Sequence, residues 1–482
     1  MKSSEFLPEL IKLKNFRDIE VSGLKIDSRE VNKGDIFFAI RGHKFDGNEF
    51  IKLAFERGAS LVIADTETED KSDVIYFKDL KQHIGIFASR FYGDPSLSLK
   101  TNCITGTNGK TTAVETFSGL SNLLGSTCAY MSTVNFSMDG LSLEKASLTT
   151  PDAISIHRNM KNAIHNDAKY LAMEASSHGL EQQRLNGIDI DYAVLTSFSH
   201  DHLDYHGDIN HYKSAKEKLF FDLHPKSNII CIDSSFGRKL YEDLLTINPN
   251  TYSVSIKQKA DFQASFKESP LGIKVNLLAL DQELTFELRT ISKYLASNII
   301  CSMAILSLEG FNNSLLEKYA QDIHLPSGRL EKIVKDNLTA YVDYAHTPEA
   351  LRCSLEEIKR IHNEPLWCVF GCGGDRDKEK RPLMGAVAQE YSDHIVITND
   401  NPRTEGEMQI INDILSGMDA QGQFIIEPDR EKAIHLAVAE IKNNLDGGVM
   451  LIAGKGHETY QEIDGNLFEF NDKEIVQSSM GL

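Results

Sequence analysis

Long apolar runs, paired cysteines and an excess of positive charge are all missing from this sequence of 482 residues. No segment approaches the roughly 20 apolar residues of a membrane-spanning helix, and the opening stretch has no apolar core of signal-peptide length. The seven cysteines are odd in number and contain no CxxC pair, which is typical of reduced cytosolic thiols. We therefore expect a cytoplasmic protein with no membrane insertion.

The charge balance narrows the class of partner. Lysine and arginine number 51 against 70 acidic residues, giving a net charge of -19. Such a balance disfavours nucleic acid or an anionic membrane as a partner, but a local basic pocket for a phosphorylated small molecule remains open. The hydrophobic fraction of 41% indicates a globular chain, and its length exceeds what one core usually supports, so two or three domains are expected.

Short apolar runs alternate with helix-length amphipathic stretches along the whole chain. The strand-like runs are "SLVIAD", "YLAMEAS", "YAVLTSF", "LWCVFGC", "HIVIT" and "VMLIAG". This alternation predicts an α/β fold with mainly parallel sheets. Turn residues and a change of pattern at 92–100 and 323–333 place domain boundaries near residues 98 and 327.

A glycine-rich loop at residues 103–120, "CITGTNGKTTAVETFSGL", is the most specific local signal. A strand that runs through glycines into a helix lets backbone N–H groups hold phosphates, while Lys110 reaches the β/γ-phosphates and Thr111 offers a hydroxyl to Mg²⁺. Only two residues separate Gly106 from Gly109, so the loop is a shortened form of the Walker pattern. The alternative is a tight glycine turn before an ordinary helix.

Histidines cluster in "SFSHDHLDYHGDINHYKSAK", residues 197–216. The spacing nearly matches the HxHxDH run of dinuclear zinc hydrolases, except that Tyr205 adds one residue too many. The other interpretation is surface histidines around a loop, which we expect for His211 and His224. His202 is a candidate ligand if Mg²⁺ accompanies a nucleotide.

Two strand ends carry polar residues suited to ligands. Glu174 ends the run "YLAME", so its carboxylate is predicted at the carboxyl edge of the sheet near the phosphate loop, where a hard cation prefers oxygen ligands. Taken alone, it could equally form a salt bridge at a strand end. "NDNPRTEGE", residues 399–407, follows the strand-like "HIVIT" and offers Asn401 and Arg403 at the same kind of edge. A solvated turn with Pro402 ending the strand is the plainer interpretation.

Together with "VDYAHTPEAL", "GCGGDRDKEKRPLMG" and "AGKGHETYQ", these motifs resemble those of the Mur ligases of peptidoglycan synthesis. The resemblance begins at "KIDSREVNKGDIFFAIRGHKFDGNEFI" and covers essentially the whole chain. It implies three α/β domains: a small UDP-MurNAc-binding domain at 1–98, a central mainly parallel ATP-binding domain at 99–327, and a Rossmann-like amino-acid-binding domain at 328–482.

The resemblance also implies a reaction. The branch of the family that this chain is most similar to adds meso-2,6-diaminopimelate to UDP-N-acetylmuramoyl-L-alanyl-D-glutamate, with ATP as co-substrate and an acyl phosphate as intermediate. We expect a monomer that binds these three small molecules. An L-lysine-adding ligase and a folylpolyglutamate synthetase-like ligase are the near alternatives; a metal hydrolase and a phosphate-loop binding module are the distant ones.

Catalytic and metal-binding residues are carried over by position. The resemblance gives Lys110, Glu174, His202 and Lys216 as catalytic, and Thr111, Glu174, His202 and Lys216 as the Mg²⁺ ligands. An ammonium beside Mg²⁺ would repel it, but in the family this lysine is carbamylated to N6-carboxylysine, which reverses the sign of the charge. We expect the same of Lys216, although the residue pattern alone suggests an exposed helical lysine.

Three groups of substrate-binding residues follow from the matching motifs. The expected ATP-binding residues are Gly106, Thr107, Asn108, Gly109, Lys110, Thr111, Thr112, Asn298, Arg329, Asp343, Tyr344 and His346. The expected UDP-muropeptide-binding residues are Ser28, Arg29, His43, Lys44, Phe45, Thr149, Thr150, Ser176, Gln182 and Arg184. The expected diaminopimelate-binding residues are Arg376, Asp400, Asn401, Pro402, Arg403, Gly454 and Glu458.

Alternatives and departures accompany these assignments. Residues 25–50 also fit an edge hairpin, and Asp343 also fits a cap for a helix that begins near Pro348. Ser197, His200, Leu148 and the run 292–298 differ from the residues usual in the family. None of these differences removes a residue with an expected catalytic role.

Overall fold

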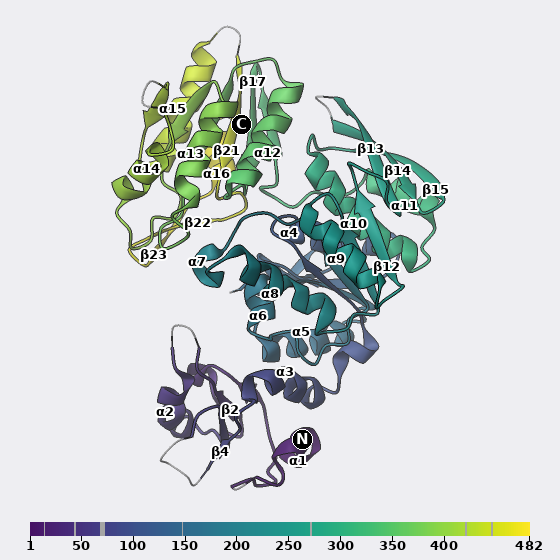
Figure 1. Cartoon of the computed structure of the whole chain (residues 1–482). Coiled ribbons are helices and arrows are strands. Elements are labelled where there is room, and N and C mark those ends of the chain that lie inside the picture. The colour runs from purple at the N-terminus through teal and green to yellow at the C-terminus, as the bar shows by residue number, and fades with distance from the viewer. Residues whose placement is uncertain are drawn as a thin grey trace.

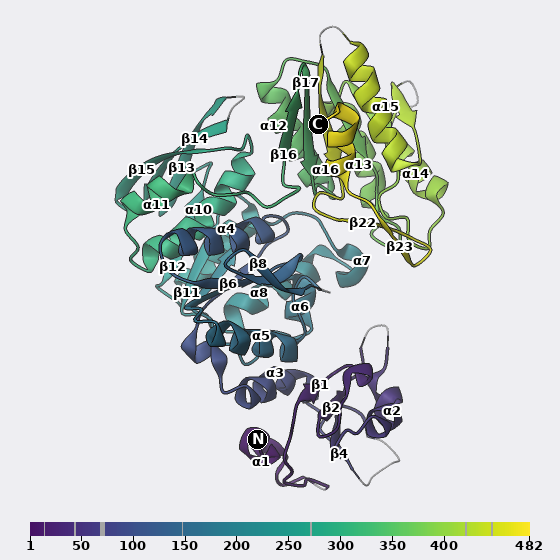
Figure 2. The same ribbon diagram turned by 180° about the vertical axis from the view of Figure 1, so that it is seen from behind.

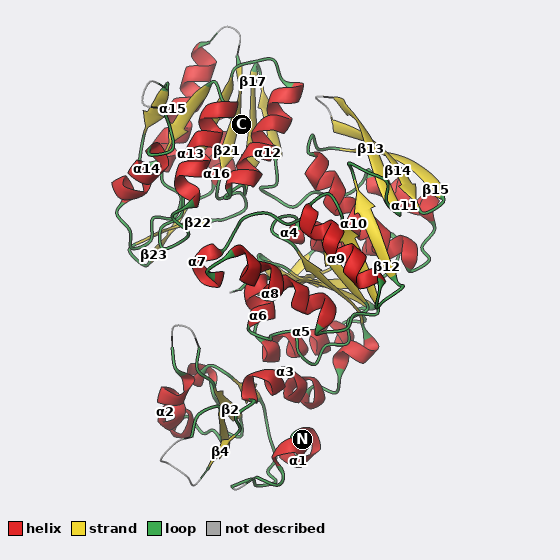
Figure 3. Ribbon diagram, in the orientation of Figure 1, coloured by secondary structure: helices red, strands yellow, loops and turns green. Residues whose placement is uncertain are grey.

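Three sheets organise the computed structural model, one after another along the chain (Figure 1). It describes residues 1–13, 15–42, 45–67, 73–146, 148–269, 272–419, 422–444 and 447–482. The N-terminal sheet lies at one end of the molecule, the central sheet in the middle and the C-terminal sheet at the other end (Figures 1 and 2). Helices pack around each sheet, as the α/β pattern of the sequence predicts (Figure 3).

The N-terminal sheet has four parallel strands in the order β1-β2-β3-β4. Its strands are β1 (Leu24–Lys25), β2 (Ile36–Ala39), β3 (Leu61–Ala64) and β4 (Val74–Tyr76), with helices α1 (Ser3–Phe6), α2 (Ile51–Glu56) and α3 (Leu80–Phe91). The edge hairpin considered for residues 25–50 is wrong, because β1 and β2 pair in parallel. A parallel pair needs a crossover rather than a tight turn.

The central sheet has eleven strands in the order β15-β14-β13-β12-β11-β10-β5-β9-β6-β7-β8. Pairing is parallel from β13 to β6, and antiparallel strands extend both edges. The strands are β5 (Lys100–Thr105), β6 (Cys128–Met131), β7 (Asn135–Met138), β8 (Leu141–Lys145), β9 (Tyr170–Glu174), β10 (Tyr192–Leu195), β11 (Ser227–Cys231), β12 (Thr251–Ser255), β13 (Phe262–Ser269), β14 (Gly272–Ala279) and β15 (Gln282–Leu288).

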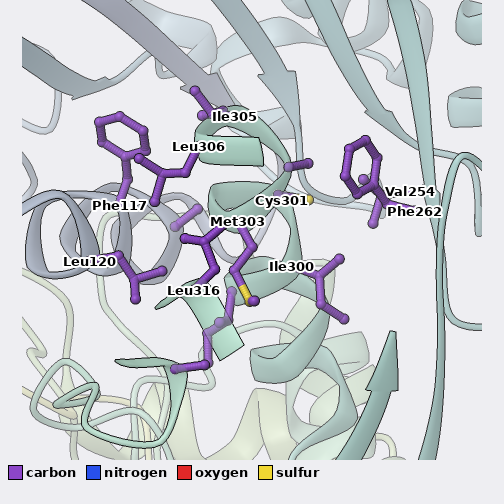
Figure 4. Packing of buried hydrophobic residues seen from close by; sticks show 14 of the residues in the cluster. Phe117, Leu120, Val254, Phe262, Ile300, Cys301, Met303, Ile305, Leu306 and Leu316 are labelled. Atoms are coloured by element: carbon purple, nitrogen blue, oxygen red, sulfur yellow. The ribbon is translucent and has the colours of Figure 1, made fainter. Parts of the chain in front are cut away.

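Eight helices in the described residues accompany this sheet. They are α4 (Lys110–Leu123), α5 (Ala153–His165), α6 (Ser177–Glu181), α7 (Leu203–His206), α8 (Ile209–Phe221), α9 (Ser235–Leu245), α10 (Lys293–Leu308) and α11 (Asn313–Ala320). Helix α10 is apolar on almost every side and packs Ile300 and Met303 in the core that α4 enters with Phe117 and Leu120 (Figure 4). Burial on all sides explains the missing polar face of α10. This packing fixes the helix that starts in the phosphate loop.

The C-terminal sheet has six strands in the order β16-β17-β21-β18-β19-β20, with only β16 antiparallel to its neighbour. The elements are β16 (Glu331–Lys335), β17 (Leu338–Asp343), α12 (Pro348–Ile361), β18 (Leu366–Phe370), α13 (Lys380–Tyr391), β19 (His394–Ile397), α14 (Glu407–Leu415), β20 (Phe424–Ile426), α15 (Arg430–Asn443), β21 (Gly448–Ala453) and α16 (Asp472–Met480). Separate apolar clusters cover its two faces, and a hairpin of β22 (Tyr460–Ile463) and β23 (Asn466–Glu469) lies beside it.

An ion pair between Arg430 and Asp472 is completely buried in this unit. Nε and Nη2 of Arg430 donate to Oδ1 and Oδ2 of Asp472, each at 2.8 Å. Arg430 also donates to the carbonyls of Asn399 and Ala453 at 3.2 and 2.9 Å. The pair therefore ties the first turns of α15 and α16 to the ends of β19 and β21.

Replacing Asp472 with asparagine should lower the free energy of unfolding by about 3 kcal/mol, because it leaves the Arg430 charge buried without a counter-ion. Urea denaturation of the isolated variant measures this change. The matched control is Asp243→Asn, which breaks the exposed pair with Lys239 and should cost less than about 1 kcal/mol. Similar losses in both variants would contradict the assigned importance of the buried pair.

All seven cysteines are free thiols, and all but Cys353 are buried. Burial raises the pKa of Cys353 to about 12 and that of Cys231 to about 11. The expectation of unpaired thiols is thus confirmed. No helix in the described parts of the chain has the length and apolar character needed to cross a membrane.

Candidate active site

The phosphate loop joins β5 to α4, as the sequence predicts. Gly109 has φ +89°, and a Cβ there would lie 2.3 Å from Oδ1 of Asn298, so this position needs glycine. The ammonium of Lys110 folds back onto the loop and donates to the carbonyls of Gly106 and Thr107 at 3.0 and 2.9 Å. The loop is therefore built around a half-buried lysine at the start of a helix.

Glu174 ends β9 at the predicted sheet edge and is fully buried. Its Oε1 accepts hydrogen bonds from Thr111 Oγ1 and from the backbone N–H of Thr133, both at 2.8 Å. Its Oε2 is also buried and has no hydrogen-bond partner among the described residues. A buried carboxylate oxygen without a donor, next to a threonine hydroxyl, fits a hard cation that prefers oxygen ligands.

Lys216 is buried rather than exposed, so the plain interpretation of this lysine is wrong. Its Nζ donates to the carbonyl of Gly106 at 2.9 Å, the same carbonyl that Lys110 contacts, and lies 4.6 Å from the ring centre of Tyr212. Burial, with the nearby charge of Lys110 acting in the same direction, holds the pKa of Lys216 well below its usual value. These surroundings favour the neutral amine.

His202 sits beside the same loop in the left-handed backbone region, with φ +55°. Its Nε2 lies 3.4 Å from Oδ2 of Asp201, and its backbone N–H donates to Oδ1 at 2.9 Å. Burial lowers the pKa of the imidazole, which keeps it neutral at pH 7. Burial alone would raise the pKa of Asp201, but neighbouring His202, His346 and Lys380 hold it at about 2. The sequence analysis missed Asp201, although it directly precedes His202.

The remaining histidines of the run disperse. His200 lies 3.7 Å from Asp377 of the C-terminal unit, and His206 packs its ring against His178. His211 and His224 are exposed, as predicted. Across the described residues no three histidine, cysteine or acidic side chains come together in a way that could hold a metal ion. The zinc-hydrolase alternative therefore lacks its ligand cluster in this part of the chain.

A cavity of about 280 Å³ lies between the phosphate loop and the start of the C-terminal unit. It is lined by members of the predicted ATP-binding group, namely Asn108, Gly109, Thr112, Asn298, Arg329, Asp343 and Tyr344. Arg329 stacks its guanidinium 4.7 Å from the Tyr344 ring and donates to Thr111 Oγ1 at 3.2 Å. These contacts connect the C-terminal unit to the phosphate loop.

Asp343 accepts hydrogen bonds from Ser354 Oγ at 2.6 Å and from the N–H groups of Leu330 and Tyr344. The alternative that it caps the following helix is wrong, because Thr347 caps α12 by accepting from Ala350 N. The helix does begin at Pro348, as predicted. His346, in contrast, does not line this cavity, and its Nδ1 is hydrogen-bonded to the Tyr344 carbonyl at 2.8 Å.

A larger cleft of about 910 Å³ separates the N-terminal sheet from the central one. Gln182 and Arg184 line it, and Arg184 donates to Gln182 Oε1 at 2.6 Å. Thr150 Oγ1 donates to Ser176 Oγ at 2.9 Å, and Arg184 also reaches the Thr150 carbonyl. The predicted muropeptide residues Thr150, Ser176, Gln182 and Arg184 thus lie together. Thr149, next to Thr150 in the chain, contacts Thr133, which also bonds to Glu174.

The residues predicted to bind the uridine-diphosphate end do not form one cluster. Ser28 is buried, Arg29 is exposed and pairs with Asp27 at 2.6 Å, and Phe45 is exposed. His43 and Lys44 lie outside the described residues. The cleft is instead lined on this side by basic residues that sequence reasoning missed, Arg41, Lys78 and Lys81. Lone basic residues carry no spacing signal that would single them out.

Arg403 follows β19 on a loop that pairs with the β22–β23 hairpin through a parallel bridge to Ile463. Its backbone is left-handed, with φ +55°. Its Nε donates to Glu462 Oε2 at 2.9 Å and its Nη1 to the Gly374 carbonyl at 2.8 Å. Nη2 makes no hydrogen bond to any residue that the structure describes. Arg376, on the loop after β18, is exposed and bonds only to the Asp375 carbonyl within the described chain.

Asn401 is almost fully buried, and both the nitrogen and the oxygen of its amide are hydrogen-bonded. Nδ2 donates to Glu458 Oε2 at 2.9 Å, while Oδ1 accepts from Lys455 Nζ at 3.0 Å and from Glu462 N at 2.9 Å. Gly454 has φ +118°, and a Cβ there would lie 2.4 Å from Oδ2 of Asp400. The buried Lys455 was missed, although it stands in the quoted run "AGKGHE".

Positions that differ from the usual family pattern have identifiable contacts. Ser197 Oγ accepts from Asn108 N and donates to Asn108 O, both at 3.0 Å, and so supports the phosphate loop. Ser292 caps α10 by accepting from Leu295 N at 3.1 Å. Leu148 is exposed at the larger cleft.

Comparison with known proteins bears on this arrangement. Three family models match successive parts of the chain: "Mur ligase family, catalytic domain" at 20–92, "Mur ligase middle domain" at 104–306 and "Mur ligase, glutamate ligase domain" at 328–456. A UDP-N-acetylmuramoyl-L-alanyl-D-glutamate–2,6-diaminopimelate ligase of Haemophilus influenzae is 36% identical over 495 residues, covering 99% of both chains. The chain belongs to the Mur ligase family.

Other Mur ligases extend the comparison. An enzyme of the same name from Aquifex aeolicus is 36% identical over 462 residues, covering 96% of this chain and 94% of its own. A solved structure of such a ligase superposes with a TM-score of 0.72 at 32% identity, covering 100% and 99% of the two chains. A folylpolyglutamate synthase of Mycobacterium tuberculosis shares the fold, with a TM-score of 0.64 at 16% identity over 76% of this chain and 91% of that one. This Mur ligase is an ATP-dependent acid–amino-acid ligase of peptidoglycan precursor synthesis.

Proposed function

We propose that this Mur ligase joins meso-2,6-diaminopimelate to the D-glutamyl carboxylate of UDP-N-acetylmuramoyl-L-alanyl-D-glutamate. The observation that carries the proposal is the guanidinium of Arg403, which follows a buried strand and keeps Nη2 free of described partners. Diaminopimelate differs from lysine by a carboxylate at its distal stereocentre, and a guanidinium matches a carboxylate geometrically. The names of the relatives from Haemophilus influenzae and Aquifex aeolicus support the same substrate.

The chemistry divides into two balanced steps. The D-glutamyl γ-carboxylate attacks the γ-phosphorus of ATP and breaks its bond to the bridging oxygen, which yields an acyl phosphate and ADP. The amine of diaminopimelate then attacks the acyl carbon, loses a proton and expels inorganic phosphate. Both steps need negative charge stabilised at the transferring oxygens, a role suited to Lys110 and the backbone of the phosphate loop.

Mg²⁺ would be held by Thr111, Glu174 and His202 together with a carbamate on Lys216. The unpaired Glu174 Oε2 and the neutral imidazole of His202 support this donor set. When bound, Mg²⁺ neutralises the phosphate oxygens and polarises them. Asp201 orients His202 through its two contacts, and Arg329 binds the nucleotide at the edge of the cavity.

The carbamate proposal rests on the surroundings of Lys216. A neutral amine attacks CO₂, forming a carbon–nitrogen bond and releasing one proton, and burial with Lys110 nearby favours that neutral form. The product places an anion where two lysines now share the Gly106 carbonyl, so a neutral neighbour of the Lys110 ammonium becomes one that attracts it.

The proposal also includes a division into domains near residues 98 and 327, a monomeric state and a cytoplasmic location.

Phosphate release from ATP tests the function directly. With UDP-N-acetylmuramoyl-L-alanyl-D-glutamate present, meso-diaminopimelate should support release with a kcat/KM roughly 10⁴-fold above that for L-lysine, because lysine leaves the guanidinium unpaired. Omitting either the muropeptide or the amine should leave only background release. Equal rates with the two amines would overturn the assigned specificity, and release with a folate acceptor in place of the muropeptide would favour the folylpolyglutamate alternative.

A further inference from the structure

Two loops meet at the carboxyl ends of neighbouring strands, and we call them the acceptor loops: residues 371–377 after β18 and residues 398–405 after β19. Direct hydrogen bonds join them. Gly374 N donates to Asn401 O at 2.9 Å, and Thr404 donates to the Asp375 carboxylate through Oγ1 at 2.9 Å. A Cβ on Gly374 would lie 1.8 Å from the Pro402 carbonyl oxygen, so the backbones approach as closely as glycine allows.

Glu405 is the side chain that spans this junction. From the second loop, its Oε1 accepts from Asp375 N of the first loop at 2.6 Å, and its Oε2 lies 3.0 Å from Lys378 Nζ. Arg381, in the first turn of α13, donates to both Glu405 oxygens at 2.9 and 3.0 Å and to the Gly373 carbonyl at 3.1 Å. Arg381 has no exposed side-chain surface. The Arg381 guanidinium thus hydrogen-bonds to both acceptor loops.

The two arginines expected to face the amine stand on opposite loops. Arg376 follows Asp375 directly, and Arg403 lies two residues before Glu405, where its Nη1 also reaches Gly374 O at 2.8 Å. Any movement of one loop past the other would change the separation of the two guanidinium groups. A displacement near 1 Å is enough to cost about a hundredfold in a positioned reaction.

We propose that Glu405, held by Arg381, is a positioning residue that sets the spacing of Arg376 and Arg403 and thereby the affinity for the incoming amine. The inference rests on the proposed function in one respect, that the acceptor loops bind the amine. Neither Glu405 nor Arg381 was among the residues expected from the sequence. The Arg381 guanidinium keeps the pKa of Glu405 at about 2, so the carboxylate is charged throughout the neutral range.

The chain supplies a matched control. Arg381 has a second acidic partner, Asp413 of α14, whose Oδ2 accepts from Nη1 at 2.7 Å. Asp413 bonds to Arg381 but not to the backbone of either loop, whereas Glu405 bonds to both Arg381 and Asp375 N. Removing one negative charge at each position separates a general loss of an ion pair from loss of the bridge between the loops.

The experiment compares Glu405→Gln and Asp413→Asn in the full-length enzyme, with steady-state kinetics for ATP and for the amine that the wild type uses faster. Glu405→Gln should raise KM for the amine at least about tenfold and change KM for ATP less than about twofold, since only the acceptor loops lose their bridge. Asp413→Asn should change both values less than about twofold. Equal effects of the two variants on the amine, or equal changes in both KM values, would overturn the proposal.

Thr404→Val provides a second route if Glu405→Gln does not fold. It removes the hydroxyl that bonds to Asp375 at an exposed position, so folding is little affected, and KM for the amine should rise about threefold. An unchanged KM for the amine in this variant would also refute the spacing role. A wild-type preference for L-lysine would refute the proposed substrate and leave the test of Glu405 intact.

Discussion

Arg403→Ala should lower kcat/KM for meso-diaminopimelate by about 10³-fold and leave KM for ATP nearly unchanged. The expected size follows from removing a guanidinium that pairs with a carboxylate in a partly desolvated site. L-Lysine has no distal carboxylate, so its low turnover should fall much less. Phosphate release measured with each amine at saturating muropeptide gives the ratio directly.

Two properties of Arg403 require controls. Its backbone is left-handed, with φ +55°, so Arg403→Asn, which tolerates this conformation better than alanine, should give the same loss if the guanidinium is responsible. Its Nε also bonds to Glu462, so Glu462→Gln tests whether loosening the arginine is enough. We expect that variant to lose less than about tenfold. Parallel losses in ATP affinity and diaminopimelate turnover would refute the selectivity role.

Lys216→Ala should lower kcat by at least about 10³-fold, because it removes the proposed carbamate, which would complete the charge around the phosphate loop. Added formate or acetate should restore part of the activity by supplying a carboxylate in the vacated space. Lys216→Arg should stay inactive, since a guanidinium remains charged and does not add CO₂. Lys213→Ala, on the same helix, is the matched control and should retain activity.

A second measurement makes the Lys216 prediction independent of turnover. The wild-type enzyme equilibrated with ¹³C-labelled bicarbonate should give a carbamate carbon resonance in NMR spectra, and Lys216→Ala should not. Full activity of Lys216→Ala without added acids, or a resonance that persists in it, would exclude the carbamate.

The fold was predictable where apolar runs are continuous. β9, β10, β18, β19 and β21 were all anticipated, because strands covered on both faces read as unbroken apolar segments. The antiparallel additions at the sheet edges were not. β14 alternates buried and exposed residues, and such half-solvated strands have no long apolar run. The error at residues 25–50 has a related cause, since two-residue and four-residue strands carry no signal for the direction of pairing.

The site divides in the same way. Lys110, Glu174 and His202 could be proposed from the sequence because each belongs to a contiguous motif that follows or ends a strand. Lys455 and Arg381 were missed because their roles arise from partners brought together by folding. Asp201 was missed although its partner His202 is the next residue in the sequence. Lys455 bonds to Asn401 across 54 residues, and Arg381 to Asp413 across 32. The amide of Asn401 is hydrogen-bonded to Glu458 and Lys455. The direct contact predicted between Asn401 and the amine stays a prediction.

The buried thiols make this enzyme convenient for spectroscopic labelling. Six of the seven are shielded, and the pKa of Cys353 is raised to about 12, so the reactive thiolate is scarce at neutral pH. Cysteines introduced at Leu141, 69% exposed on the edge strand β8 of the central sheet, and at Leu467, 67% exposed on the β22–β23 hairpin, should therefore react with maleimide dyes ahead of every native thiol. Energy transfer between the two dyes can then follow the separation of these units during turnover without any native cysteine being replaced.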